Sequence, residues 1–129
     1  MKKKTITTLV TTLMLIAASV PVFASSYSSY RLGPVSENNY TGPHQKVEQT
    51  QCITNNPTAM SNVSGSEVTF WACDDDKNQW SKDYVMRIGQ NTDIRFTSEI
   101  DKGQYVIMGM EATHWSKSTG YVSGNVNFH

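Results

Sequence analysis

The hydrophobic residues of this chain fall into short runs that alternate with polar residues, and turn-forming residues separate the runs. Residues 92–97 show the alternation most clearly, because Ile94 and Phe96 fall on one side of an extended chain and polar residues on the other. The same criterion predicts strands over residues 47–54, 67–73, 84–88, 92–97, 104–110 and 121–128. Short strands at this spacing predict an all-β fold, a single antiparallel β-sandwich of about six or seven strands.

Turn-forming residues lie between these strands, at residues 55–57, 64–66, 74–78, 101–103 and 118–120. Each segment contains at least one glycine, proline, aspartate or asparagine, and these residues favour tight turns. After residue 24, no part of the sequence has apolar residues at sustained helical spacing. We therefore expect hairpin connections and at most a short helical turn.

The first 24 residues have the three parts of a secretory signal peptide. Lysines occupy positions 2–4, an apolar stretch covers residues 6–20, and Val22-Phe23-Ala24 has small residues at the two positions that signal peptidase reads. The apolar stretch is interrupted by threonines and is shorter than the ~20 apolar residues that a spanning helix needs. We predict cleavage after Ala24 and secretion of a chain with no membrane span.

Composition divides the remaining chain into two parts. Residues 25–46 are rich in Ser, Tyr, Asn, Gly and Pro, so we expect little regular structure there beyond a short extended piece at residues 30–32. The predicted organisation is a signal peptide over 1–24, an N-terminal segment over 25–46 and a β-sandwich domain over 47–129.

Charge argues against one class of partner. Without the three lysines at positions 2–4, 8 basic residues remain beside 11 acidic ones, a net charge of −3. The basic residues are scattered singly, whereas nucleic-acid binding needs a basic patch that displaces phosphate counterions. We therefore expect no nucleic-acid partner.

Cys52 and Cys73 are the only cysteines, and both fall in predicted strands. Secreted proteins meet an oxidising compartment, and the chain has no Cys-x-x-Cys spacing typical of redox chemistry. We predict a structural disulfide between them, which would stabilise the fold by roughly 3 kcal/mol. A reactive thiol or a reduced pair is the alternative.

Motifs for metals and catalysis are incomplete. Asp74, Asp76 and Asn78 begin a calcium-loop pattern, but Gln79 stands where the pattern needs glycine and Val85 where it needs glutamate. We interpret this segment as a solvated acidic turn. The three histidines are far apart, and neither a Gly-x-Ser-x-Gly motif nor a phosphate-binding glycine loop occurs. We predict no metal, no cofactor and no catalytic residue.

Exposed aromatic residues are the strongest remaining signal for function. Trp80 and Trp115 each lie in a polar stretch, so we select them as a candidate binding surface, with a role as lids on the core as the alternative. Exposure of Trp80 and Trp115 would favour a secreted binding module.

Several segments together resemble a known group of proteins. They are Val68-Thr69-Phe70-Trp71-Ala72, Gly89-Gln90 before Ile94-Arg95-Phe96-Thr97, Gly109-Met110-Glu111 and Val122-Ser123-Gly124. In this order they resemble a family of small, uncharacterised secreted proteins of Firmicutes, and the lysine-led signal peptide is similar to those of Gram-positive bacteria. The resemblance covers residues 30–129 and implies a fold, with no catalytic residue.

Three functions follow as hypotheses. The first is a secreted, non-catalytic module that binds an extracellular or cell-wall partner. The second is a secreted, bacteriocin-like antimicrobial polypeptide, although the chain lacks a cationic amphipathic segment for membranes. The third is an extracellular enzyme with an unrecognised site, which a cluster of converging carboxylates and His114 in a pocket would support.

Overall fold

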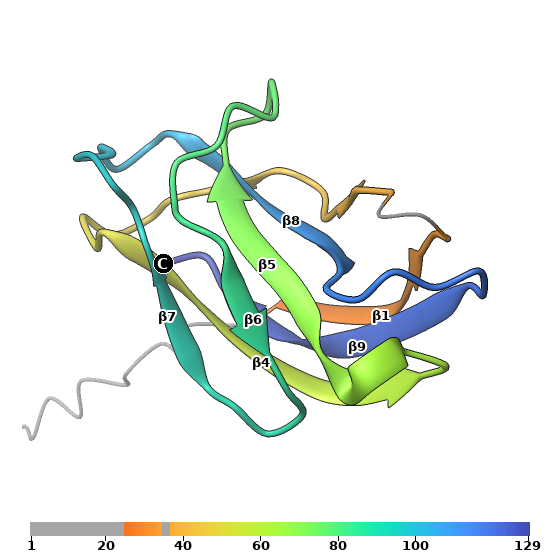
Figure 1. The fold of residues 1–129 in the computed structure, drawn as a ribbon. Helices are drawn as coiled ribbons and strands as arrows, with labels where there is room; N and C mark the ends of the chain where they lie inside the picture. Colours follow the sequence, from red (N-terminus) through yellow and green to blue (C-terminus); the bar gives the residue numbers. More distant parts are fainter. Residues whose placement is uncertain (1–24, 35–36) are drawn as a thin grey trace, which may run out of the picture.

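The computed structural model describes residues 25–34 and 37–129 (Figure 1). The predicted signal peptide and its cleavage site lie outside these residues. The described residues form nine strands and one short 3₁₀ turn, with the following bounds: β1 Ser25–Leu32, β2 Asn39–Tyr40, β3 His44–Gln45, β4 Cys52–Ser61, η1 Ser64–Ser66, β5 Val68–Cys73, β6 Tyr84–Met86, β7 Thr92–Arg95, β8 Tyr105–Ala112 and β9 Gly120–Asn127.

The strands form two antiparallel sheets that pack face to face. One sheet has the order β1-β9-β4-β7, and the other has the order β2-β8-β5-β6 with β3 also paired to β8. Figure 1 shows β5 and β6 in front of β4 and β9. The predicted all-β sandwich is confirmed, although the described residues contain more strands than we expected. Among these residues, no helix is long and apolar enough to span a membrane.

The core lies between the sheets and follows the alternation in the sequence. In β5, Val68, Phe70 and Ala72 face the core, and the outward Trp71 and Cys73 belong to a smaller cluster on the other side of the sheet. Both faces of β5 are therefore covered, which explains why all six of its residues are buried. The opposite sheet contributes inward side chains from β1, β4, β7 and β9, which are Tyr27, Ile53, Ile94, Val122 and Val126.

The N-terminal segment belongs to the sandwich, so the expectation of little regular structure over residues 25–46 is wrong. β1 pairs with β9 along most of its length, including the extended piece at residues 30–32. The buried Tyr27 donates a hydrogen bond from its hydroxyl to Asn55 Oδ1 at 3.0 Å. This contact joins β1 to β4, so it cannot be predicted from the Ser-rich and Tyr-rich composition of residues 25–30 alone.

β4 also differs from the prediction, because it begins at Cys52 and continues through the segment expected to be a turn. Asn55 is fully buried and bonded to Tyr27, and Pro57 lies where the pairing with β9 shifts register before Ala59. A proline without an N–H is tolerated in a strand at such a bulge. Asn55-Asn56-Pro57 therefore marks a kink in a central strand.

The predicted disulfide is absent, because Cys52 and Cys73 are both buried free thiols. Cys52 lies on β4 and Cys73 on β5, in opposite sheets. Their neighbours Ile53 and Ala72 face the core, so alternation turns both thiols outward from the sandwich. Packed sheets are ~10 Å apart, and a disulfide requires Cα atoms within about 7 Å.

Candidate functional site

Three loops meet at one end of the sandwich. They cover residues 62–67 between β4 and β5, residues 87–91 between β6 and β7, and residues 113–119 between β8 and β9. Antiparallel pairing brings them together, because Val68 opposite Met86 and Ala112 places the start of β5 beside the ends of β6 and β8. We call these three loops the loop end.

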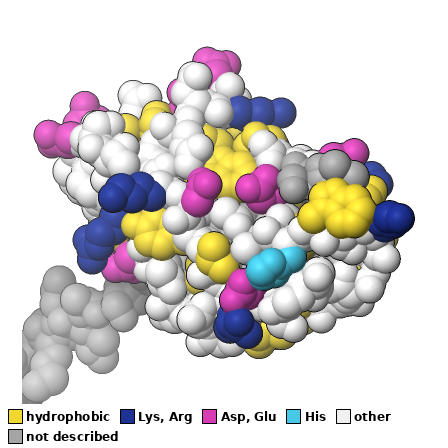
Figure 2. All heavy atoms as spheres, in the orientation of Figure 1, with side chains coloured by type: hydrophobic (Ala, Val, Ile, Leu, Met, Phe, Trp, Pro, Cys, Tyr) yellow, Lys and Arg dark blue, Asp and Glu magenta, His cyan; other side chains and the backbone are white. Residues whose placement is uncertain are grey.

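Glu67 joins the three loops. Its Oε1 accepts a hydrogen bond from Arg87 Nη2 at 2.5 Å, and its Oε2 lies 2.8 Å from His114 Nε2. The hydrogen bond from His114, with that from Arg87, holds the pKa of Glu67 below its usual range. Figure 2 shows a histidine, an acidic and a basic side chain side by side on this face. The pairing ties each loop to the next.

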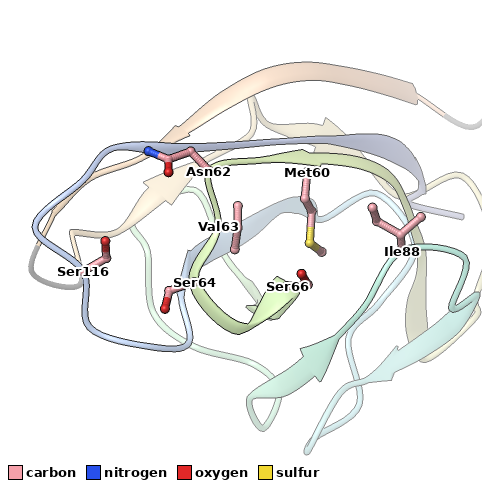
Figure 3. Close-up of a pocket in the computed structure, with 7 residues that line it drawn as sticks. All are labelled: Met60, Asn62, Val63, Ser64, Ser66, Ile88 and Ser116. Carbon is pink, nitrogen blue, oxygen red and sulfur yellow. The ribbon is translucent and has the colours of Figure 1, made fainter.

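A cleft of about 410 Å³ opens within the loop end (Figure 3). Its residues combine apolar side chains with hydroxyl and amide groups: Met60, Asn62, Val63, Ser64, Ser66, Ile88 and Ser116. Figure 3 shows Met60, Val63 and Ser66 pointing into the same space, with Ser116 on one side and Ile88 on the other. None of the lining residues is charged. The cleft therefore suits a ligand with both apolar and hydrogen-bonding groups.

The backbone at the cleft adopts uncommon conformations. Asn62, Gly65 and Ser66 have φ angles of 54°, 69° and 52°, in the left-handed region. A Cβ added to Gly65 would lie 2.5 Å from His114 Cδ2, so only glycine lets this imidazole approach the turn. Left-handed residues cost free energy and cluster at functional loops, where the surrounding structure holds them. This turn is thus held against the His114 loop.

The two tryptophans selected from the sequence differ in their exposure to solvent. Trp115 belongs to the loop after β8, and 60% of its surface is exposed. Trp80 is partly buried against the core, and its ring packs edge to face on Phe96 at 6.0 Å. Its backbone N–H also donates to Ala72 O at 2.8 Å. Trp115 is therefore available to a partner, whereas Trp80 covers the core.

The other residues singled out in the sequence lie elsewhere. Both carboxylate oxygens of Asp74 accept hydrogen bonds from Asn78, at 2.8 and 2.9 Å, which closes the acidic turn on itself. The described part of the chain has no group of three His, Cys, Asp or Glu residues arranged to hold a metal ion. His114 pairs with Glu67, whereas Glu111 lines a separate cavity with Trp71. Glu111 and His114 thus have different surroundings.

Sequence reasoning missed Glu67, Arg87 and the cleft. Glu67 is 20 residues from Arg87 and 47 from His114, so no local spacing reports the contacts. A topological signal was present, because consecutive antiparallel strands place every second loop at the same end of a sandwich. This rule places the turn at residues 64–66 and the stretch before Trp115 at the same end of the sandwich.

Comparison with protein families and with curated proteins adds no relative. No protein-family model matches the chain, and no curated protein matches it. The resemblance to secreted proteins of Firmicutes therefore stays a prediction. The geometry of the loop end is therefore the basis for assigning a function.

Proposed function

We propose that this protein is a secreted, non-catalytic module that binds an extracellular or cell-wall partner through the loop end. The observation that carries the proposal is the exposed Trp115 beside His114, whose imidazole is tied through Glu67 to the neighbouring loops. An anchored loop that presents a large aromatic side chain has the properties of a binding hot spot.

The composition of the loop end supports binding through shape and hydrogen bonds. Ser64, Ser66 and Ser116 supply hydroxyl groups that both donate and accept, and Asn62 supplies an amide. Tryptophan contributes a large contact area at low conformational cost, while serine and asparagine provide adaptable hydrogen bonds. Antibody loops at the end of a β-sandwich also combine aromatic contact residues with serine and asparagine as hydrogen-bonding residues.

Preorganisation supports the proposal as well. A loop that orders only on binding loses affinity to the entropy of ordering. Here the Glu67 contacts and the hydrogen bond from Asn62 Nδ2 to Thr119 O, at 2.8 Å, join the loops of the free protein. We expect these contacts to lower the cost of binding.

The test compares retention of the protein on intact Gram-positive cells and on isolated cell wall. The full chain is produced in a secreting host, and mass spectrometry of the product determines whether the N-terminus is Ser25. Trp115→Ala should weaken retention by about thirtyfold, the equivalent of a hot spot of ~2 kcal/mol. The change should leave the free energy of unfolding within ~0.5 kcal/mol, because the side chain is mostly exposed.

Tyr105→Ala is the matched control. Tyr105 is also an exposed aromatic residue, at 48%, but it begins β8 at the opposite end of the sandwich. It should leave retention unchanged. Equal loss in both variants, or retention that Trp115→Ala does not alter, contradicts the proposal. Growth inhibition of the same cells by the parent protein would instead favour the bacteriocin-like alternative.

A further inference from the structure

A second cavity opens on the outer face of the sheet that contains β5. Its volume is about 110 Å³, and it shares no lining residue with the cleft of the loop end. Its residues come from β5, β8, the segment before β2 and the connection between β5 and β6: Asn38, Trp71, Gln79, Asp83 and Glu111. Figure 2 shows acidic side chains beside hydrophobic ones on the face of the molecule that carries β5. This cavity is not part of the proposed binding site at the loops.

Strand register explains why the Trp71 ring beside the cavity lies across β8. Trp71 on β5 pairs with Gly109 on β8, and the indole ring occupies the space that a side chain at residue 109 would fill. A Cβ at Gly109 would lie 2.6 Å from Trp71 Cζ2. Tyr40, which also pairs with Gly109, packs edge to face on the indole at 6.0 Å. The glycine therefore lets the ring lie across the sheet.

Two carboxylates approach this ring. Glu111 is two residues beyond Gly109 on the same face of β8, and Asp83 precedes Tyr84, whose partner is Phe70. Within residues 25–34 and 37–129, neither carboxylate is in an ion pair, since the acidic members there are Glu48, Glu67 and Asp93.

The two carboxylates also affect one another. Burial, and then the neighbouring charge of Asp83, raises the pKa of Glu111. Asp83 receives a hydrogen bond from Gln79 Nε2 at 2.8 Å, which fixes its position but supplies no positive charge. A cation placed between Asp83 and Glu111 would relieve their repulsion.

A lysine of the protein already packs on the aromatic pair Tyr40 and Trp71, next to the cavity. Lys77 Nζ lies 4.7 Å from the centroid of the Tyr40 ring, which itself packs on Trp71. Lys77 belongs to the turn after β5, whereas Glu111 lies toward the other end of that strand, opposite Thr69. The electron-rich faces of tyrosine and tryptophan both attract ammonium groups.

We propose that the cavity beside Trp71, between Asp83 and Glu111, binds a primary ammonium group carried by an extracellular ligand. The carboxylates supply charge-assisted acceptors and the Asn38 and Gln79 amides supply neutral ones, beside the mostly buried Trp71. Amino sugars and lysine side chains both present such a group. This proposal is independent of the loop end, so either site can fail without the other.

The test follows the indole N–H signal of Trp71 by NMR, with Trp71→Phe to assign it. n-Butylammonium chloride is the probe, and n-butanol at the same concentration is its neutral match. The ammonium should shift the signal in a saturable way, and butanol should not. Equal shifts from both compounds, or no shift from either, overturn the proposal with no variant needed.

Variants then assign the contact to the carboxylates. Glu111→Gln and Asp83→Asn should each weaken binding of n-butylammonium by about tenfold, as expected for loss of a hydrogen bond to a charged group. Glu99→Gln, which removes an exposed acid outside the cavity, should leave it unchanged. Unchanged affinity in both cavity variants overturns the proposal. Glucosamine and Nα-acetyl-lysine amide, measured against glucose and Nα-acetyl-norleucine amide, identify whether a sugar or a peptide carries the preferred amine.

Discussion

Gly109→Ala tests whether the Trp71 ring lies directly on the backbone of β8. In the structure, the added methyl group would overlap Cε2 and Nε1 of the indole and lie 2.6 Å from Cζ2. Carbon atoms pack best at ~3.5–4 Å, so the ring has to move by about 1 Å. Tyr40 already packs on that ring and restricts its movement. Overpacking of this kind costs ~1–3 kcal/mol in free energy of unfolding.

A second glycine variant isolates this steric cost. Replacement of glycine by alanine also stabilises a protein by ~0.4–1 kcal/mol, because it restricts the unfolded chain. Gly42→Ala shares that gain, but its added Cβ has no heavy atom within 4 Å and its φ is not left-handed. The difference between the two variants therefore approximates the overlap with Trp71, ~1–3 kcal/mol.

Urea unfolding monitored by tryptophan fluorescence measures both variants. The free energy of unfolding of a small domain falls by ~1–3 kcal/mol per M urea, so a 2 kcal/mol difference shifts the midpoint by roughly 1 M. Near-ultraviolet circular dichroism should also change in Gly109→Ala, because the indole moves. Equal midpoints for Gly109→Ala and Gly42→Ala would falsify the placement of Trp71 over Gly109.

Three further predictions concern buried groups. Cys52 and Cys73 should both be reduced in the native protein. Burial, which raises the pKa of Cys73 to about 11, should restrict labelling of that thiol until the protein unfolds. An intact mass lower by two hydrogens, the mass of a disulfide-bonded form, contradicts this prediction. Lys46→Met should raise the free energy of unfolding by ~1 kcal/mol at pH 7, because Lys46 is only 1% exposed and burial lowers its pKa. Between the lowered pKa and the unfolded value near 10.5 the unfolded state binds more protons at residue 46, so the stability of the parent relative to Lys46→Met should rise with pH. Urea unfolding of both proteins from pH 7 to 10.5 measures this difference, in which the opposite effect of the raised cysteine pKa values cancels, and a difference that does not change with pH contradicts the prediction. Phe70→Ala should cost ~3–5 kcal/mol in the same assay, because Phe70 is fully buried between the sheets, and a loss below 1 kcal/mol is inconsistent with that position.

The sequence predicts the second half of the sandwich well, because its strands alternate between a core and a solvated or separately covered face. β5 to β9 each lie within a few residues of their predicted ranges. β1 is different, because Tyr27 is buried through pairing with β9 and a hydrogen bond to Asn55, neither of which is local. Pro57 misleads for a related reason, since the register shift that accommodates it depends on a strand more than 60 residues away.

The candidate site could be predicted only in part. The polar stretch around Trp115 correctly indicated an exposed tryptophan, but the similar stretch around Trp80 did not, because Phe96 and the core cover that ring. The cysteines show the same limit, since strand assignment alone does not reveal which sheet each strand joins or which way its thiol faces. Contacts of Glu67 with His114 likewise arise only when the strands assemble.

The most direct test of binding through the loop end is oxidative footprinting of the protein bound to isolated cell wall. Hydroxyl radicals oxidise exposed aromatic and sulfur-containing side chains, and mass spectrometry locates the products. Binding should protect Trp115 in the exposed loop and Met60 in the cleft, while Tyr105 at the opposite end stays as reactive as in the free protein. Protection of Tyr105 with continued oxidation of Trp115 would contradict the account.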